Sequence, residues 1–316
     1  IKLDGNYPVG TNNVALGNSA LTSITTGIAN TFIGNASGDA LTEGQYNVGI
    51  GMNALGVDTQ GSRNVAVGYG TLDAQNFTSA TNSYNTAVGH LAGTSVTTGV
   101  QNTLIGGLAG DALTTGSYNT SLGGKSLSEA TTGTQNFAGG YQALESTSTG
   151  SYNVGVGVNA LRLNTTASYN TAVGYQAGYS NTTGTQITAL GVQALKLNTT
   201  GNYNSAVGVN SLLSNTTGSN NTAIGDSSLI NNTTGASNTA VGKYALQSNT
   251  TASNNTAVGF QAAYSNTTGT RNVSLGDSAL FSNTTASYNT ALGFRGLYSN
   301  TTGASNVGLG YQALDA

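Results

Sequence analysis

One five-residue pattern, an Asn followed by a short apolar stretch and a Gly, recurs along almost the whole chain. Asn289–Gly293, with the sequence Asn-Thr-Ala-Leu-Gly, is one of 18 copies. Successive copies start at every 17th position, except that the step from Asn64 to Asn85 is four positions longer. A fixed period of this length is typical of a solenoid, in which each repeat is one coil that rests on its neighbours. The pattern therefore predicts one elongated repeat domain over residues 13–316, preceded by a partial coil at residues 1–12.

The five residues of the pattern, numbered as coil positions 1 to 5, alternate as a short strand does. Position 5 is Gly in all 18 copies, position 4 is aliphatic in 17, and position 3 is Ala, Ser or Gly in 16. In a strand, positions 2 and 4 point to one side and position 3 to the other. We expect the small side to line a narrow interior and the larger side to pack on a partner outside the coil. The reversed assignment is the alternative, and in both cases the two faces are expected to be buried.

The rest of each coil is predicted to hold a second short strand. Its centre is an Ala-Leu pair at positions 8 and 9, as in Ala143-Leu144, and it is too short for an ordinary helix. Position 9 is Gly in three coils whose position 12 is Leu or Val, at Gly38, Gly93 and Gly110. We interpret this exchange as conservation of core volume, which Gly178 lacks. Two short strands per coil, in about 18 coils of 17 residues, describe an all-β parallel β-solenoid.

Two columns of Asn are predicted to run along the solenoid as hydrogen-bonded amide ladders. In nine consecutive coils, from the one that starts at Asn153 to the one that starts at Asn289, positions 12 to 14 read Asn-Thr-Thr. Asn side chains stacked at one level per coil can bond to one another and to nearby backbone. The triplets also match the acceptor sequence for N-glycosylation, but their regularity favours a ladder. The position 1 column is the second ladder, interrupted by Ile187, and consists of Asn13, Asn30, Asn47, Asn64, Asn85, Asn102, Asn119, Asn136, Asn153, Asn170, Asn204, Asn221, Asn238, Asn255, Asn272, Asn289 and Asn306.

The sparse charge of the chain argues against several classes of partner. Only 6% of residues are charged, and 8 basic and 11 acidic residues give a net charge of −3. Without a basic patch, nucleic acid is not expected as a partner. The scattered acids do not form a calcium-binding repeat, and no apolar run approaches the ~18 residues of a membrane helix, so membrane insertion is not expected. With no Cys, a disulfide framework and a thiolate metal site are excluded.

The sequence predicts no catalytic, cofactor or metal site. His90 is the single histidine, so a site with several histidines requires several chains around a shared axis, and a Ser-His-Asp triad requires His90 itself. Acidic residues such as Asp111 and Asp226 are isolated along the chain, so the paired carboxylates of a glycosidase are not expected. Gly-rich pieces belong to the coil period and open no helix, unlike phosphate loops. We therefore expect a protein that is not an enzyme.

Burial within one coil is too small to stabilise the chain alone. Ordering a residue costs about 1–2 kcal/mol in backbone entropy, whereas one coil offers about three or four apolar side chains at ~25 cal/mol per Å². A continuous stripe of side chains from positions 2 and 4 would also exceed the apolar patch that monomers tolerate. Closed symmetry is the common way to bury such a surface. The predicted assembly is a homotrimer.

The coil motif resembles the head repeat of trimeric autotransporter adhesins of the YadA type, whose coils carry Asn-Ser-x-Ala-x-Gly. Matching stretches are Asn204–Gly208, Asn170–Gly174 and Asn64–Gly68, and Asn170–Ala177 also resembles repeats of bacteriophage tail-fibre proteins. The resemblance covers the chain from about position 13 to position 313 and departs in the longer period of this chain, since adhesin-head coils are shorter. It implies a trimeric, left-handed parallel β-roll that serves as a fibre or adhesive head, outside the cell or on a virion.

The irregular features of the repeat are the candidates for binding. The four-residue insertion falls within residues 71–84, and loops that interrupt a solenoid often carry function. Its candidate receptor contacts are Gln75, Asn76 and Phe77, and a tolerated bulge is the alternative. Tyr recurs at position 17, where it can cover the coil turn or stack on sugars, and covering is favoured. The Thr pairs resemble those of ice-binding solenoids, but adjacent Thr residues point opposite ways and leave one column.

The function predicted from the sequence is that of a structural and adhesive fibre. We expect a trimeric rod of a phage tail fibre or a bacterial surface adhesin, with copies of the chain as partners and a cell-surface glycan or protein as receptor. A self-assembling extracellular filament, built by head-to-tail stacking of solenoids, is the alternative. An enzyme on a β-helix, such as a polysaccharide lyase, ranks third because no acid or base constellation is present.

Overall fold

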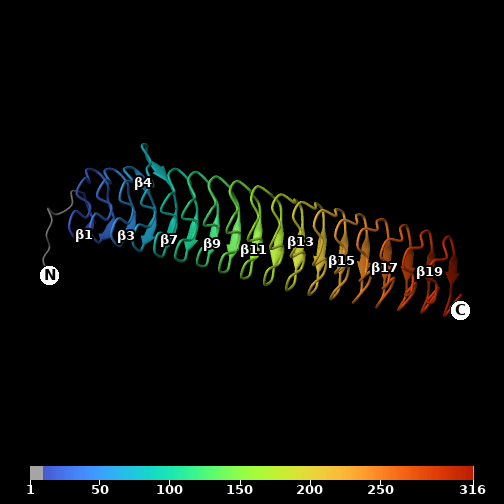
Figure 1. Ribbon diagram of the computed structural model, residues 1–316. Coiled ribbons are helices and arrows are strands. Elements are labelled where there is room, and N and C mark those ends of the chain that lie inside the picture. The colour runs from blue at the N-terminus through green and yellow to red at the C-terminus, as the bar shows by residue number, and fades with distance from the viewer. Residues whose placement is uncertain (1–9, 316) are drawn as a thin grey trace. The chain divides into compact units, whose positions relative to one another are not determined.

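One strand of three residues per coil is the regular element of the fold (Figure 1). The computed structural model describes residues 10–315 as an all-β parallel β-solenoid of about 17 turns, with no helix in that range. The chain divides into two compact units, Ile1–Val158 and Asn159–Ala316, whose described residues are 10–158 and 159–315. The partial coil predicted for residues 1–12 falls largely outside the described residues.

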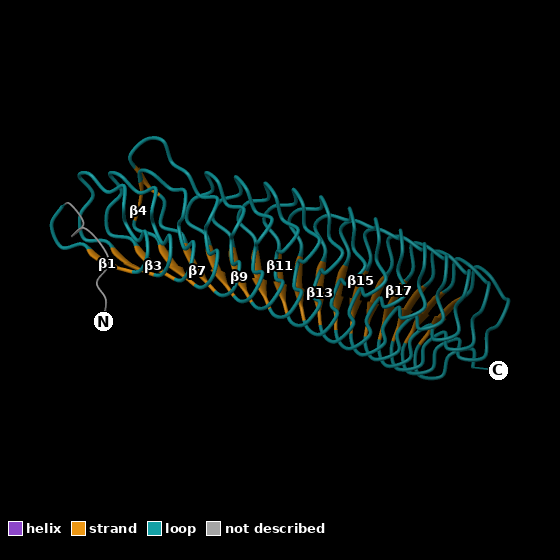
Figure 2. Cartoon of the chain, turned by 60° about the vertical axis from the view of Figure 1, so that its left-hand side comes forward, coloured by secondary structure: helices purple, strands orange, loops and turns teal. Residues whose placement is uncertain are grey.

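The N-terminal unit carries nine of these strands. They are β1 (Val14–Leu16), β2 (Thr31–Ile33), β3 (Val48–Ile50), β5 (Val65–Val67), β7 (Thr86–Val88), β8 (Thr103–Ile105), β9 (Thr120–Leu122), β10 (Phe137–Gly139) and β11 (Val154–Val156). Two shorter strands, β4 (Gly61–Ser62) and β6 (Thr81–Asn82), pair with each other in a separate parallel sheet. Within this unit, Figure 2 shows β1, β3, β7, β9 and β11 in one row, with loops forming the rest of each coil and β4 away from that row.

The C-terminal unit carries nine further strands, each paired in parallel with the next. They are β12 (Thr171–Val173), β13 (Thr188–Leu190), β14 (Ser205–Val207), β15 (Thr222–Ile224), β16 (Thr239–Val241), β17 (Thr256–Val258), β18 (Val273–Leu275), β19 (Thr290–Leu292) and β20 (Val307–Leu309). The register places equivalent coil positions side by side, so that Ala172 lies beside Ala189 and Ala189 beside Ala206.

The strands bury their small side and turn their larger side outward. Ala189 and Ala206, at position 3, are 0% exposed and pack in an interior completed by Leu195 at position 9. Val173, at position 4, is 40% exposed. The expected assignment of faces is therefore correct. No part of the same coil reaches the outward face, so the expected burial of this face against a partner outside the coil stays a prediction.

The second strand predicted around positions 8 and 9 is absent among residues 10–315. Ala143-Leu144 and the equivalent pairs lie in turns. The flanking residues explain why, since position 7 and position 9 have positive φ values, as at Gln142 (56°) and Leu144 (53°). A residue in this left-handed region cannot continue a strand. The apolar pattern at positions 8 and 9 marks burial and not an extended backbone.

The positive φ values also reverse the direction in which backbone groups point along the solenoid. In the coil that starts at Ile187, the N–H groups that donate to the following coil, at 2.8–3.0 Å, include those of Thr188, Leu195, Leu197 and Thr199. Those that donate to the preceding coil, also at 2.8–3.0 Å, include those of Gly191, Gln193 and Tyr203. A coil inside the solenoid is thus tied to both neighbours around most of its circumference, and not only at its strand.

The Gly at position 5 is required by both its conformation and its surroundings. Gly208 has φ of +131°, and a Cβ added there would lie 2.7 Å from the carbonyl carbon and oxygen of Gly225 in the next coil. A side chain would therefore be strained and would push adjacent coils apart. These two constraints account for a Gly at this position in all 18 copies.

The space at a position 9 Gly is filled mainly by side chains other than the predicted position 12 residue. A Cβ added at Gly38 would lie 2.5 Å from the ring of Phe32, a large residue at position 3 of the same coil. A second pair of this kind is Gly110 and Leu104. Gly178 is filled from the preceding coil, where Leu161 approaches its added Cβ to 2.9 Å. Core volume is conserved, but across positions that sequence alone does not connect.

Both Asn columns lie in the interior. At position 1, the Asn47 side-chain oxygen accepts the backbone N–H of Asn64 at 2.9 Å, and its Nδ2 donates at 2.9 Å to the carbonyl of position 15 in its own coil. At position 12, Asn198 Nδ2 donates to Asn181 Oδ1 at 2.8 Å. Ile187 donates its N–H to the ladder but has no amide to extend it. Asn198 is fully buried, so the Asn of its glycosylation-like triplet is inaccessible in the folded chain.

Candidate functional site

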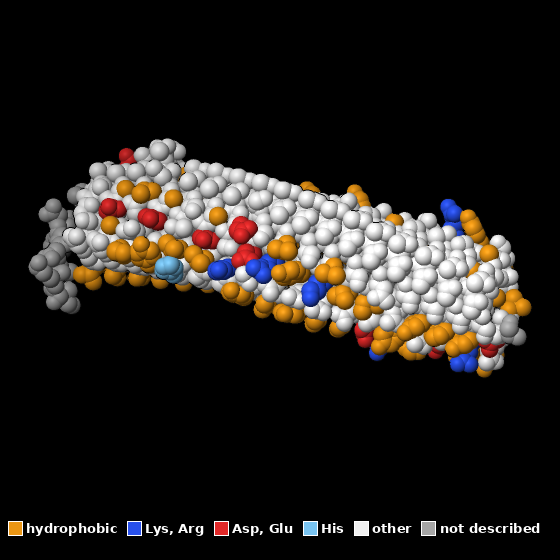
Figure 3. Space-filling view, in the orientation of Figure 1, with side chains coloured by type: hydrophobic (Ala, Val, Ile, Leu, Met, Phe, Trp, Pro, Cys, Tyr) orange, Lys and Arg blue, Asp and Glu red, His pale blue; other side chains and the backbone are white. Residues whose placement is uncertain are grey.

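An exposed stripe of apolar side chains follows the strands of each unit, and we call it the apolar stripe. Its members stand at positions 2, 4 and 6, and hydrophobic side chains gather along this edge in Figure 3. In the N-terminal unit the members that are at least 38% exposed are Val14, Ile50, Met52, Tyr69, Ile105, Leu122, Phe137, Tyr141 and Val158. In the C-terminal unit they are Val173, Tyr175, Val192, Val209, Ile224, Phe260, Val273, Leu275, Leu292, Phe294, Val307, Leu309 and Tyr311, also each at least 38% exposed.

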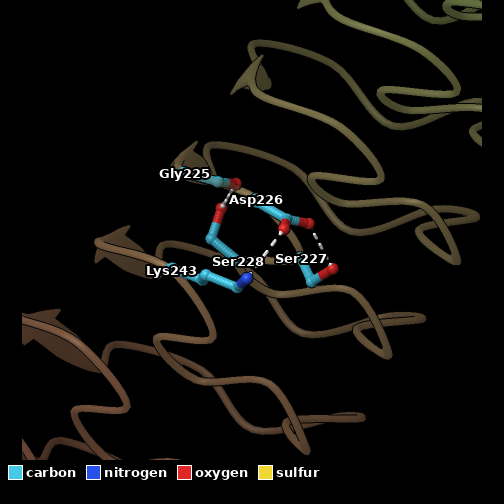
Figure 4. A network of polar contacts seen from close by, with 5 residues as sticks. All are labelled: Gly225, Asp226, Ser227, Ser228 and Lys243. Carbon is cyan, nitrogen blue, oxygen red and sulfur yellow. Dashed lines mark hydrogen bonds and ion pairs between the residues drawn. The ribbon is translucent and has the colours of Figure 1, made fainter.

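Two oppositely charged residues of the apolar stripe form an ion pair with each other. Asp226 and Lys243 occupy position 6 of consecutive coils, with Nζ and Oδ2 3.4 Å apart (Figure 4). Ser227 donates its hydroxyl to Asp226 Oδ1 at 2.7 Å. The Ser227 hydrogen bond and then Lys243 lower the pKa of Asp226, and Asp226 in turn raises the pKa of Lys243. Covering the stripe here would bury a compensated pair and not a lone charge.

The insertion is attached to the core by a buried carboxyl group. Gln75 stands at position 12, where its Nε2 donates to Asp58 Oδ2 at 2.6 Å and its Oε1 accepts from Asn85 Nδ2 at 2.8 Å. Asp58 Oδ1 accepts the backbone N–H of Phe77 at 3.1 Å. Burial raises the pKa of Asp58, and the hydrogen bonds from Gln75 and Phe77 oppose that rise. The network fixes the segment that leads into the exposed loop to the solenoid interior.

Of the three predicted receptor contacts, only Asn76 lies on the surface. Gln75 is 0% and Phe77 is 7% exposed, so a ligand reaches their side chains only if the loop opens. The Gln60 N–H donates to the Phe77 carbonyl, and the Gln60 carbonyl accepts the N–H of Thr81, so residues 78–80 loop out between these two bonds. Thr78, Ser79 and Ala80 are exposed.

Aromatic side chains form two further columns, at position 17 and at position 10. The position 17 tyrosines are about half exposed, as at Tyr118 and Tyr169, and so extend into solvent. At position 10, the rings of Tyr264, Phe281 and Tyr298 stack at 5.0 Å spacings with interplanar angles of 6° and 12°. Because neighbouring rings cover each other's faces, this stack presents mainly ring edges and is a poor platform for a sugar ring.

The Thr pairs give one exposed column. At position 13, the Thr199 hydroxyl donates to the Thr216 backbone carbonyl at 3.0 Å and is only partly exposed. At position 14, Thr200 and Thr217 are exposed. One line of hydroxyl groups is narrower than the two-dimensional array that ice binding would require.

Within residues 10–315, no group of three or more His, Cys, Asp or Glu side chains is placed to hold a metal ion. His90 lies in the apolar stripe and stacks on Tyr69, with ring centroids 5.4 Å apart. No helix long and apolar enough to cross a membrane occurs in the described part of the chain.

Comparisons with protein-family models, curated proteins and solved structures give no match for this chain. The resemblance to YadA-type and tail-fibre repeats therefore rests on the coil motif alone. The structure adds the geometry of the solenoid and of its exposed surfaces.

Sequence reasoning overlooked one group of residues around the insertion. Arg63 stands at position 17 between two tyrosines of the same column, in the coil just before the insertion. The signal was available, because Arg63 is the single Lys or Arg between residues 3 and 124. Its neighbours become apparent only when coils are aligned across the longer step.

Proposed function

We propose that this chain is a structural fibre protein that assembles as a homotrimer along its apolar stripe. In this proposal the fibre has an adhesive role outside the cell or on a virion tail, and its β-roll is left-handed as the resemblance implies. The single observation that carries the proposal is the apolar stripe itself. It recurs coil after coil in each unit, on the strand side that nothing among residues 10–315 covers.

The size and regularity of the apolar stripe support burial against copies of the same chain. In each unit it presents apolar surface on the order of several hundred Å², and patches of that size mark interaction sites. A partner with the same coil spacing can meet every coil in the same way, which an unrelated globular partner cannot do. Rotational symmetry about an axis parallel to the solenoid then places equivalent stripes face to face. The compensated Asp226–Lys243 pair removes one obstacle to that burial.

The test is the mass of the full chain in solution by light scattering, together with electron micrographs. The expected result is three times 31.5 kDa, with rods of finite length. Val192→Lys combined with Val209→Lys places two cations in the apolar stripe and should lower the mass. Thr200→Lys combined with Thr217→Lys adds the same charges at exposed position 14 and should leave the mass unchanged.

Three results would contradict the proposal. A monomeric wild-type chain would show that the apolar stripe does not drive association. Equal behaviour of the two double variants would place the interface elsewhere. Open-ended polymers of the wild type would favour the self-assembling filament.

A further inference from the structure

Arg63 is held in a sandwich of two aromatic rings. Its guanidinium carbon lies 5.0 Å from the ring centroid of Tyr46 and 5.7 Å from that of Tyr84. All three residues stand at position 17 of consecutive coils and are exposed. An Arg stacked between rings loses little conformational freedom when it binds a ligand, because its plane is already fixed.

The insertion holds one edge of this guanidinium and leaves the other available. Arg63 Nε donates to Asn82 Oδ1 at 3.1 Å. Asn82 belongs to β6, and β6 pairs with β4, the strand that ends just before Arg63. Within residues 10–315, no carboxylate forms an ion pair with Arg63. The two Nη groups thus have unused capacity for a planar anion, which guanidinium groups bind through paired hydrogen bonds.

Two hollows adjoin the sandwich. One, of about 180 Å³, lies under the insertion and is lined by Gln45, Tyr46, Ser62, Arg63, Ala80, Thr81 and Asn82. The other, more open and of about 470 Å³, is lined by Tyr84, Gln101 and Thr103. Amide and hydroxyl groups beside an aromatic ring are the groups that hydrogen-bond and stack on a sugar.

We propose that this notch, formed by the Tyr46–Arg63–Tyr84 sandwich and the insertion, binds an acidic saccharide. Arg63 holds the sugar carboxylate, the amides of Gln45 and Asn82 meet ring hydroxyls, and Tyr84 lies against the adjoining sugar. The biological meaning of the site rests on the proposed adhesive function, since it would be the place at which the fibre recognises a glycan. The binding itself depends only on residues of one unit.

The C-terminal unit contains a matched arrangement without the notch. Arg271 stands at position 17, 5.6 Å from the ring centroid of Tyr288 in the next coil. There the guanidinium Nη1 donates to the Tyr288 hydroxyl at 2.8 Å, and no insertion lies beside it. Arg271 therefore controls for the effect of losing a surface Arg that is stacked on Tyr.

The experiment measures binding of sialyllactose to the full chain by NMR or calorimetry, with neutral lactose and inorganic sulfate as comparisons. We expect millimolar or tighter binding of sialyllactose, weaker binding of lactose, and a loss of about 10- to 100-fold in Arg63→Gln. Arg271→Gln should bind as the wild type does, and Tyr84→Ala should bind more weakly than the wild type. Circular dichroism melting curves establish that the variants are folded.

Several outcomes would overturn the proposal. They are equal binding of sialyllactose by the wild type and Arg63→Gln, no binding at all, binding of free sulfate as tight as that of the sugar, and tighter binding of an acidic Glu-rich peptide. The mass of the same samples separates the two proposals. Saccharide binding by a monomer would leave the site standing and contradict the trimeric fibre, whereas a trimer that does not bind would do the reverse.

Discussion

The two units fill the same interior position in different ways. At position 12, the N-terminal unit has mixed residues, among them Leu41, Val96 and Leu113, and all three are 0% exposed. The C-terminal unit has Asn at the same place in coil after coil, and these side chains form a continuous chain of hydrogen bonds. Asn215 and Asn232, for example, are joined at 2.9 Å.

The difference shows what each kind of core permits. An apolar contact needs only matching volume, so the residue at position 12 can differ from one coil to the next. The N-terminal unit accommodates Asp58 and Gln75 in this column, with the insertion next to Gln75. An amide in a ladder needs an amide on each side, since a buried amide without a partner is costly. The C-terminal unit is correspondingly regular.

The largest expected effect comes from placing an amide in the apolar column. Leu113→Asn removes a buried side chain and leaves an amide between Val96 and Ala130, neither of which can bond to it. We expect a loss of about 4 kcal/mol in the free energy of unfolding. Urea unfolding followed by circular dichroism measures it, with exposed Thr115→Asn as the control. A loss below about 1 kcal/mol would show that the two columns are interchangeable.

The converse change should cost less. Asn232→Leu removes the partner of Asn215 Oδ1 and one of the two partners of Asn249 Nδ2, whose bond to the Ala252 carbonyl remains, while the Leu gains apolar burial. We expect a net loss of about 2–3 kcal/mol. Asn231→Leu, at the exposed neighbouring position, is the control. Hydrogen exchange should show the loosening spreading to the two adjacent coils, and a change confined to one coil would contradict the ladder as a coupled network.

The two units should respond to pH with opposite sign. Because burial raises the pKa of Asp58, its contribution to stability is full below the ordinary value near 4 and is lost as the pH rises through the folded-state value. The pKa of Asp226 is lowered, so its smaller contribution is present above the ordinary value and is lost as the pH falls. Unfolding midpoints of Asp58→Asn and Asp226→Asn, each relative to the wild type, should therefore slope in opposite directions between about pH 3 and pH 7. Parallel slopes would refute this assignment.

The smallest effect should be equal in the two units, because the backbone of the coil is the same. Gln135 and Gln186 both stand at exposed position 17, with φ of 57° and 56°. Replacing either by Gly relieves a left-handed residue and should add about 0.5–1 kcal/mol of stability. Thr132→Gly and Thr183→Gly, at position 14, should instead destabilise. Unequal gains in Gln135→Gly and Gln186→Gly would mean that the units differ in backbone as well as in core.

The sequence predicted the features that depend on residue size and on strict recurrence. The small residue at Ala189, the Gly at Gly208 and the stacking of Asn side chains follow from the constant period of the repeat. The turn at Ala143-Leu144 did not, because Leu at positive φ is unfavourable in isolation and is held there by bonds between coils.

The candidate site was predicted less well than the fold. Gln75 and Phe77 belong to the insertion in sequence, yet the Asp58 carboxyl group draws both into the interior. Arg63 lies outside the insertion in sequence and reaches it through Asn82. Asn82 belongs to the β4–β6 pair, which the periodic pattern does not predict. Contacts between coils on either side of the longer step cannot be predicted from the period of the repeat.

The two directions of backbone hydrogen bonding within each coil have an electrostatic consequence. In an α-helix all peptide dipoles align, so that partial charges accumulate at its ends. In the coil that starts at Ile187, N–H groups point toward the following coil at Thr188 and toward the preceding coil at Gly191 and Gln193. Opposed peptide dipoles largely cancel within one coil, as they do between the strands of a sheet. Coils can therefore be added to such a stack without building up an electric field along it.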